Sequence, residues 1–230
     1  MAKQKTKAGR GRAILMLLLV FGPASLLIMF SLGKCENKFN QLDDFGAIGD
    51  YSFIDASGDT LSNKDMEGKI VIFSTIQNTC PRDCAIDIAR FNLLIYQKFR
   101  KLQRTSSHIK FVSILVDHEG KPVEDLSEVA FMLDDEIQEF NPDVWKIVSG
   151  DPAQIYDFTS NGHNLYKARE EKAYKGMPWL ESMLLVDKQN HLRSLRSGAT
   201  EGMLRDLNEH IAILEKEYDK KAAKEKEEKK

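Results

Sequence analysis

The sequence predicts an α/β fold built around a buried central sheet. Two stretches, IVIFSTI at residues 70–76 and IKFVSILVD at 109–117, are continuous apolar runs rich in β-branched residues. Runs of this kind are typical of strands that are buried on both faces. Each run is followed by a segment with apolar residues at three- and four-residue steps, which predicts an amphipathic helix.

The first half of the domain follows from these patterns. Residues 51–63, YSFIDASGDTLSN, alternate apolar and polar residues around a Ser-Gly-Asp turn and predict a β-hairpin. The helix after the first strand has an apolar stripe formed by Ile88, Phe91, Ile95, Phe99 and Leu102. The helix after the second strand stops near Pro142, and its stripe consists of Leu126, Val129, Leu133, Ile137 and Phe140.

The second half adds a short helix, a hairpin and a final helix. Asp151-Pro152 predicts a helix start, with an acceptor at the N-cap and proline at the first position, and the helix runs to about Phe158. Residues 182–187 and 191–197 predict a hairpin. The last helix has a stripe of Met203, Leu204, Leu207, Ile211 and Leu214. Residues 216–230 have mixed charge and predict a solvated, frayed tail.

This order of elements is that of a thioredoxin-like α/β sandwich with an N-terminal β-hairpin extension. We assign residues 49–215 to this domain and residues 33–48 to a stalk that leads into it. A hydrophobic content of 42% and a charged content of 30% are ordinary for a folded domain.

The N-terminus predicts one transmembrane helix. Residues 1–12 carry five basic residues and no acid, and residues 13–32 contain no charge. A run of this length is just sufficient to cross a bilayer core, and the basic segment favours a cytoplasmic N-terminus. A cleaved signal peptide is the main alternative, because Gly22-Pro23 interrupts the apolar run. Lipidation of Cys35 is a further alternative, although Lys34 fits a lipoprotein cleavage box poorly.

In each case the domain is expected on the extracytoplasmic side of a membrane, where a cysteine pair can persist oxidised. Without the five N-terminal cations, the formal net charge of −2 becomes −7 for residues 13–230. A net acidic domain argues against a nucleic-acid partner. Three cysteines are too few for a disulfide-framework fold.

The chemistry is expected at Cys80 and Cys84, in the stretch NTCPRDCAID that directly follows the first buried strand. A helix N-terminus at this point would stabilise a thiolate at Cys80. On a helix, the i, i+4 spacing puts both sulfurs on one face, within reach of a disulfide or of one soft cation. A static structural disulfide remains an alternative, but so short a loop gives little stabilisation.

At residues 50–215 the sequence resembles the Sco/SenC copper chaperones of cytochrome c oxidase assembly. The resemblance is carried by Gly68-Lys69 before the first strand, the C-P-x-x-C motif at residues 80–84, the strand ending at Asp117, and the stretch from Asn141 to Asp151. It implies that Cys80 and Cys84 bind copper together with a distant histidine. The histidine position falls at about Trp179, and no histidine lies between His163 and His191.

Two residues could supply a third copper ligand instead. Met177 is soft enough for Cu(I) and lies two residues from the expected position, and His118 follows the second buried strand. Pro178 and Trp179 are candidates for substrate docking, because thioredoxin-like reductases hold a cis-proline in roughly this region.

Three functions follow for this extracytoplasmic, membrane-anchored protein. The first is copper delivery to, or thiol reduction of, the copper-binding subunit of a respiratory oxidase. The second is a general thiol–disulfide oxidoreductase of the cell envelope, in which Cys80 attacks another envelope thiol protein and Cys84 resolves the intermediate without a metal. The third is a non-catalytic binding module on a thioredoxin fold, with the cysteines as a fixed bridge.

Overall fold

The structure is a computed structural model that describes residues 21–22, 41–78, 86, 88–102, 108–160, 163–164 and 177–228. The chain divides into two units, Met1–Asn40 and Gln41–Lys230, and the second contains the predicted domain. No helix within the described residues is long and apolar enough to cross a bilayer. The predicted transmembrane segment, residues 13–32, lies outside them except for Phe21 and Gly22.

The described part of the domain is organised around a seven-stranded sheet with the order β2-β1-β5-β4-β3-β8-β9. Its strands are β1 (Ser52–Asp55), β2 (Thr60–Ser62), β3 (Ile70–Gln77), β4 (Ile109–Val116), β5 (Trp145–Ser149), β8 (Ser182–Val186) and β9 (Leu192–Ser197). The central strands β3, β4 and β5 are parallel, and β8 is antiparallel to β3. Strands β6 (Thr159–Ser160) and β7 (His163–Asn164) form a separate pair.

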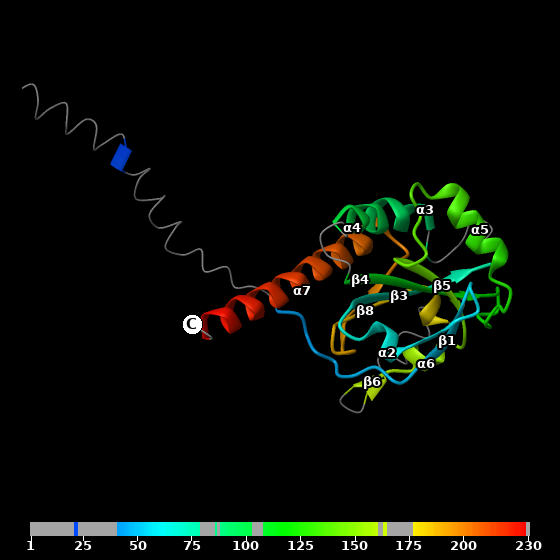
Figure 1. The fold of residues 1–230 in the computed structure, drawn as a ribbon, viewed down its shortest axis with the longest axis horizontal. Coiled ribbons are helices and arrows are strands. Elements are labelled where there is room, and N and C mark those ends of the chain that lie inside the picture. The colour runs from blue at the N-terminus through cyan, green and yellow to red at the C-terminus, as the bar shows by residue number, and fades with distance from the viewer. Residues whose placement is uncertain are drawn as a thin grey trace, which may run out of the picture. The chain divides into compact units, whose positions relative to one another are not determined.

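Helices cover both faces of this sheet (Figure 1). They are α2 (Asn63–Met66), α3 (Ile88–Phe91), the π-helix η1 (Asn92–Tyr96), α4 (Gln97–Leu102), α5 (Ser127–Glu136), α6 (Ala153–Tyr156), the 3-10 helix η4 (Pro178–Leu180) and α7 (Glu201–Glu228). Ile70 and Ile72 of β3 pack towards α3, η1, α5 and α7, whereas Val71 and Phe73 pack towards the β1–β2 hairpin, α2 and α6. The predicted α/β sandwich with an N-terminal hairpin is confirmed.

The two apolar runs form the centre of the sheet, as predicted. All residues of β3 except Gln77 are buried, and so are all residues of β4 except Lys110. The predicted hairpins are β1–β2 and β8–β9. The sequence analysis missed β5, which lies between β4 and β1 and joins the N-terminal hairpin to the central sheet.

The helix that follows the cysteine motif contains a π-helical segment that its apolar stripe does not reveal. Residues Asn92–Tyr96 are π-helical between two α-helical turns. The Asn208 Nδ2 atom of α7 donates a hydrogen bond to the Leu94 carbonyl oxygen at 2.6 Å. A π segment leaves a backbone carbonyl without its usual α-helical partner, and Asn208 supplies a donor at this point.

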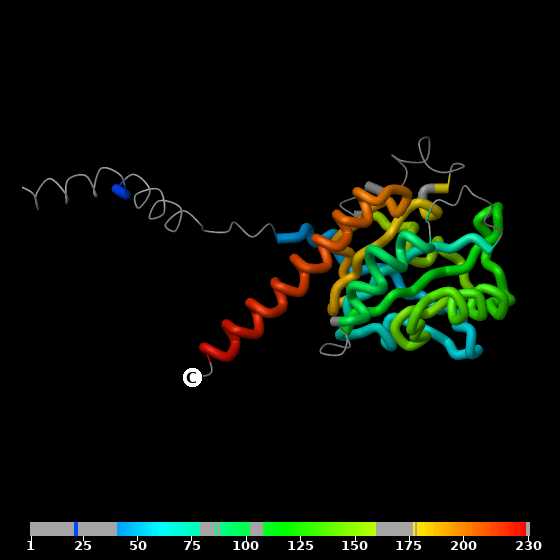
Figure 2. Tube along the Cα trace, turned by 90° about the horizontal axis from the view of Figure 1, so that it is seen from above, coloured from blue at the N-terminus to red at the C-terminus, as the bar shows by residue number. Residues whose placement is uncertain are grey.

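Both ends of the domain are more ordered than the sequence predicts. The predicted frayed tail, residues 216–230, is helical as far as Glu228, and the end of α7 extends beyond the sheet in the two views of Figures 1 and 2. The second half of the predicted stalk also belongs to the domain. Phe45 N donates to Leu192 O at 2.9 Å and Leu192 N donates to Gly46 O at 2.9 Å, so this segment covers the edge strand β9.

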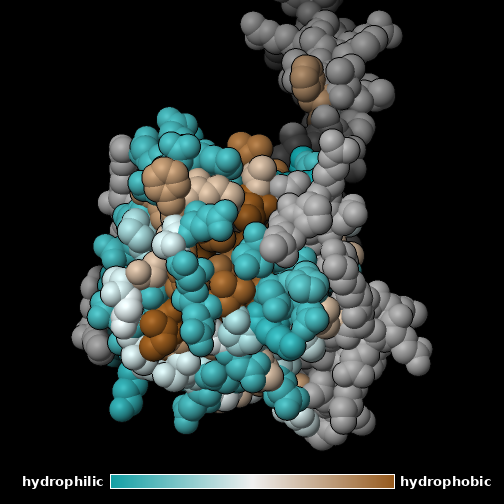
Figure 3. All heavy atoms as spheres, turned by 90° about the vertical axis from the view of Figure 1, so that its right-hand side faces the viewer, coloured by the Kyte–Doolittle hydropathy of each residue, from teal (hydrophilic) through white to brown (hydrophobic). Residues whose placement is uncertain are grey.

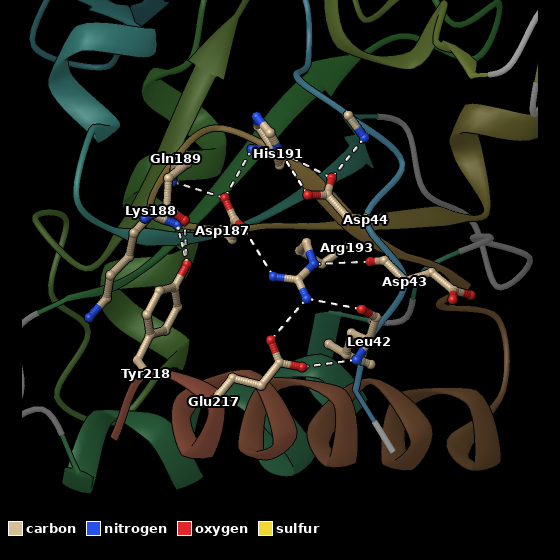
Figure 4. A network of polar contacts seen from close by, with 11 residues as sticks. Leu42, Asp43, Asp44, Asp187, Lys188, Gln189, His191, Arg193, Glu217 and Tyr218 are labelled. Atoms are coloured by element: carbon tan, nitrogen blue, oxygen red, sulfur yellow. Dashed lines mark hydrogen bonds and ion pairs between the residues drawn. The ribbon is translucent and has the colours of Figure 1, made fainter. Parts of the chain in front are cut away.

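A buried charge network holds this N-terminal segment in place (Figure 4). Arg193 of β9 is 7% exposed and donates to Asp187 Oδ2 at 3.1 Å and to Glu217 Oε2 at 2.9 Å. Its remaining contacts go to the carbonyl oxygens of Leu42 and Asp43, each at 3.0 Å. Glu217 Oε1 accepts a hydrogen bond from Leu42 N at 2.9 Å. Burial opposes the charge of Arg193, but the two carboxylates raise its pKa.

We expect Arg193→Met to lower the free energy of unfolding by about 3–5 kcal/mol, because it leaves two buried carboxylates without their cation. The matched control is Arg205→Met. Among the described residues, Arg205 is exposed and pairs with Glu201 one helical turn away, so its loss is expected to cost less than about 0.5 kcal/mol. Chemical denaturation of both variants measures the difference, and equal losses would contradict the role of the network.

A second buried charge stabilises the β1–β2 hairpin. Asp55 accepts hydrogen bonds from the Ser57 and Asp59 backbone N–H groups at 3.0 and 3.1 Å, and from Lys146 Nζ of β5 at 2.7 Å. Burial alone would raise the pKa of Asp55, but the hydrogen bonds from Lys146 and Ser57 outweigh it and lower the pKa to about 2. The ionised carboxylate therefore links the hairpin turn to β5.

The hairpin is expected to be acid-labile because of this carboxylate. The pKa of Asp55 is lower in the folded state than in the unfolded state. The ionised carboxylate therefore stabilises the folded state above about pH 4, and this stabilisation is lost as the pH falls towards 2. We expect the free energy of unfolding to fall by about 2 kcal/mol more in the wild type than in Asp55→Asn across this window. Urea denaturation at several pH values measures the difference, and parallel pH profiles would be inconsistent with it.

Candidate functional site

The candidate site lies at the carboxyl ends of β3 and β4. The two strands are parallel, with Gln77 opposite Val116, so they end at the same edge of the sheet. Asn78 N donates to Val116 O at 2.9 Å and fixes the point where the chain leaves β3. Cys80 follows two residues later. The carboxyl edge of a parallel sheet is where α/β folds place their ligands and reactive groups.

Cys80 and Cys84 lie outside the described residues, and so does Cys35. The structure does describe the residues on either side of the cysteine motif. On the far side, Ile86 is 6% exposed and packs on the turn before α7. A Cβ atom at Gly198 would lie 2.9 Å from Ile86 Cγ1 and 2.7 Å from Met183 Cε. The motif thus begins two residues after an anchored strand end and ends two residues before a buried isoleucine.

The segment before β8 lies beside the end of β3. The hydroxyl of Thr75, which is 2% exposed in β3, donates to the Trp179 carbonyl oxygen at 3.0 Å. Leu180 N donates to Met177 O at 3.1 Å and closes the short η4 turn. Met177 and Trp179, both predicted as site residues, are therefore held at the same edge of the sheet as the start of the cysteine motif.

The turn after β4 contacts the same segment. Asp117 Oδ1 accepts hydrogen bonds from Glu119 N and Lys121 N, which lower the pKa of Asp117 and fix the turn. A Cβ atom at Gly120 would lie 2.6 Å from Met177 Sδ and 3.2 Å from Trp179 Nε1. The structure thus brings together Met177, Trp179 and the turn that contains His118.

The two candidate third ligands differ in their surroundings. Met177 is half-buried in this contact. The side chain of His118 is 68% exposed, and its Nε2 atom lies 3.9 Å from Glu119 Oε1. Within the described residues no group of three histidine, cysteine or acidic side chains is arranged to hold a metal ion.

Trp179 stands where the resemblance implies a histidine. Its Nε1 atom is buried and has no hydrogen-bond partner among the described residues. An indole N–H is a donor only, so this side chain cannot replace an imidazole as a ligand. No peptide bond among the described residues is cis, so the cis-proline arrangement considered for Met177-Pro178 is not found there.

Three other histidines have partners away from this edge. His108 Nε2 lies 3.3 Å from Glu215 Oε1, and His191 Nδ1 lies 3.0 Å from both Asp44 carboxylate oxygens. His210 Nδ1 lies 2.6 Å from Ser194 Oγ, and burial together with Arg196 lowers the pKa of His210. These side chains bind structural neighbours.

Sequence reasoning missed Thr75 and Gly120, which position the predicted residues. Thr75 is hidden within an apolar strand, and nothing in IVIFSTI distinguishes its hydroxyl as a contact to Trp179. Gly120 carries a weak signal, because glycine after Asp-His-Glu at a strand end suggests a turn.

Figure 3 shows the surface on the right-hand side of Figure 1. Hydrophobic side chains lie near the middle of this surface and hydrophilic side chains surround them.

Solved structures with a similar chain course include BsSco, described as a member of the Sco family of cytochrome c oxidase assembly proteins. It is 17% identical, with a TM-score of 0.46 and coverage of 74% of this chain and 98% of BsSco. A SCO1/SenC family lipoprotein from Bacillus anthracis is 19% identical, with a TM-score of 0.45 and coverage of 73% and 96%. A thiol peroxidase from Chromobacterium violaceum is 10% identical, with a TM-score of 0.45 and coverage of 77% and 90%.

None of the curated protein sequences matches the chain. The comparison with family models, in contrast, does find a match. The model described as SCO1/SenC matches residues 40–212, which is more than half of the chain and includes the cysteine motif, the turn after β4 and the Met177–Trp179 segment. The chain belongs to the SCO1/SenC family.

Proposed function

We propose that this chain is a membrane-anchored, extracytoplasmic SCO1/SenC protein that acts through Cys80 and Cys84. Its task is copper delivery to, or thiol reduction of, the copper site of a respiratory oxidase. The observation that carries the proposal is the C-P-x-x-C motif directly after β3, between Asn78 and Ile86, in a chain of this family. Residues 13–32 supply the anchor, and the acidic domain has no nucleic-acid partner.

The thiol chemistry requires no group beyond the two cysteines. The Cys80 thiolate attacks one sulfur of a disulfide in the partner, which forms a mixed disulfide and releases the other sulfur as a thiolate. The Cys84 thiolate then attacks Cys80, which forms the Cys80–Cys84 disulfide and releases the second partner thiolate. Two electrons pass from the cysteine pair to the partner, and an external thiol reductant restores the pair.

Copper is the cargo in the other branch of the proposal. Two thiolates are soft ligands that favour Cu(I). Met177 is held at the same edge of the sheet and can add a thioether, whereas His118 is exposed in the neighbouring turn. With Trp179 at the position implied for histidine, we propose a site that binds copper weakly until the partner completes it.

Trp179 also favours a second candidate function, a thiol–disulfide oxidoreductase of the envelope that works without a metal. Indole supplies no lone pair to a metal, and a thiol exchange reaction needs no third ligand. The two functions share the cysteines and differ in whether the reduced pair binds Cu(I) at all.

The chain of residues 1–230, reduced and kept in detergent without oxygen, tests the proposal. We expect one Cu(I) per chain, and exchange of the pair with oxidised glutathione. Cys80→Ser and Cys84→Ser should each weaken Cu(I) binding by about a hundredfold or more, because a single thiolate remains. Cys35→Ser is the control and should bind as the wild type does. Retention measured against a Cu(I) chelator gives the affinities.

The outcomes separate the alternatives. Absence of bound Cu(I) even without a competitor, together with ready glutathione exchange, would favour the metal-free oxidoreductase. A pair that neither binds copper nor exchanges would refute both functions and leave a fixed bridge in a binding module.

Trp179→His tests how position 179 limits copper binding. We expect Cu(I) affinity to rise by about tenfold or more, because imidazole is a good copper ligand. Trp179→Phe removes the indole without adding a ligand and is the matched control. Equal Cu(I) affinities in the two variants would mean that position 179 does not face the cysteine pair.

A further inference from the structure

Helix α5 lies at the surface of the domain and presents an aromatic side chain on its outer face (Figure 1). Val129 and Leu133 of this helix are buried in the core, whereas Phe131 is 74% exposed. Phe131 belongs to neither of the two described hydrophobic clusters. Single exposed apolar side chains are common in folded proteins, so the surroundings of Phe131 decide whether it has a role.

Three carboxylates surround Phe131 on this face. Side chains three and four residues apart are neighbours on a helix surface. Glu128 precedes Phe131 by three residues, Asp134 and Asp135 follow it by three and four, and all are exposed. We call these four residues the α5 outer face. The wider segment, residues 122–145, contains eight acidic residues and no lysine, arginine or histidine.

The carboxylates of α5 are not placed where they would stabilise the helix. The C-terminal end of a helix carries the negative end of its dipole, so anions are unfavourable there and cations are favourable. Asp134, Asp135 and Glu136 lie in the last turn of α5, which contains no basic residue. Departures from local preference of this kind are expected at functional surfaces. The α5 outer face thus combines an exposed ring with charges that the fold does not require.

The negative charge limits what can cover this face. Nucleic acids and anionic lipids are repelled by it, and a second copy that presents the same face would bring like charges together. A lysine or arginine side chain, in contrast, can lie over the face of a phenylalanine ring while it pairs with neighbouring carboxylates. The chemistry that complements the α5 outer face is therefore cationic.

We propose that the α5 outer face is a docking surface for a basic segment of a partner protein. A lysine or arginine side chain of the partner stacks on Phe131 and pairs with Glu128 and Asp135. All residues of this surface belong to one described helix, so the inference does not depend on the chemistry of the cysteine pair.

The chain offers matched controls for the ring and for the charges. Leu93 of η1 is 71% exposed, close to the value for Phe131, but residues 88–102 contain four basic residues and no acid. Leu93→Ala therefore removes an equally exposed apolar side chain from a surface of opposite charge. Glu225 and Glu227 are exposed near the end of α7, so their double substitution by glutamine removes two carboxylates elsewhere.

A fluorescently labelled nona-arginine peptide is the probe, and its anisotropy on titration with the full chain in non-ionic detergent gives the dissociation constant. We expect Phe131→Ala to weaken binding by about two- to fivefold, as for an exposed cation–π contact. Glu128→Gln combined with Asp135→Asn should weaken it by about threefold or more. Both control variants should bind as the wild type does.

Phe131→Leu provides a second variant that keeps an apolar side chain on α5 but removes the ring. We expect it to weaken binding as Phe131→Ala does, and circular dichroism verifies that each variant is folded. Wild-type affinity in both Phe131 variants would overturn the proposal, and so would equal losses in the control variants, which indicate general attraction to an acidic domain. Dimerisation of the peptide-free chain that is lost in Phe131→Ala would assign the face to a second copy instead.

Discussion

The site depends on how firmly the central strand β3 is held. It pairs with β4 along its whole length and with β8 on its other side, and its side chains enter two separate hydrophobic clusters. A strand fixed in this way cannot shift its register without moving apolar side chains out of both clusters. The point where the chain leaves the sheet towards Cys80 is therefore set by the core.

Three neighbouring segments converge on that edge, and each is anchored differently. The turn after β4 is shaped by the Asp117 carboxylate, the η4 segment is tied to β3 through Thr75, and the turn before α7 packs on Ile86. The chemistry assigned to the cysteines would then take place beside fixed surroundings. Preorganised surroundings of this kind favour one geometry of a thiol pair or a metal complex over others.

The charge network around Arg193 lies at the other end of the sheet. Val186 of β8 pairs with Val71 near the start of β3, so Asp187 and its partners lie at the opposite end of the sheet from Gln77, where β3 ends. There the network fastens residues 42–46 to β9 and α7. The segment of residues 42–46 is therefore attached at this end of the sheet.

The sequence by itself determined the central strands, the amphipathic helices and both hairpins, and it places the cysteine motif directly after β3. Continuous apolar runs and helical stripes are local consequences of burial, so they can be recognised without neighbours. Only the tertiary structure decided that β5 inserts between β4 and the hairpin, that residues 42–48 cover β9, and that α7 continues through Glu217 into the predicted tail. It also decided that Gly120 meets Met177 and Trp179. These contacts join residues far apart in the sequence, and their energies come from hydrogen bonds and charges whose partners no local pattern specifies.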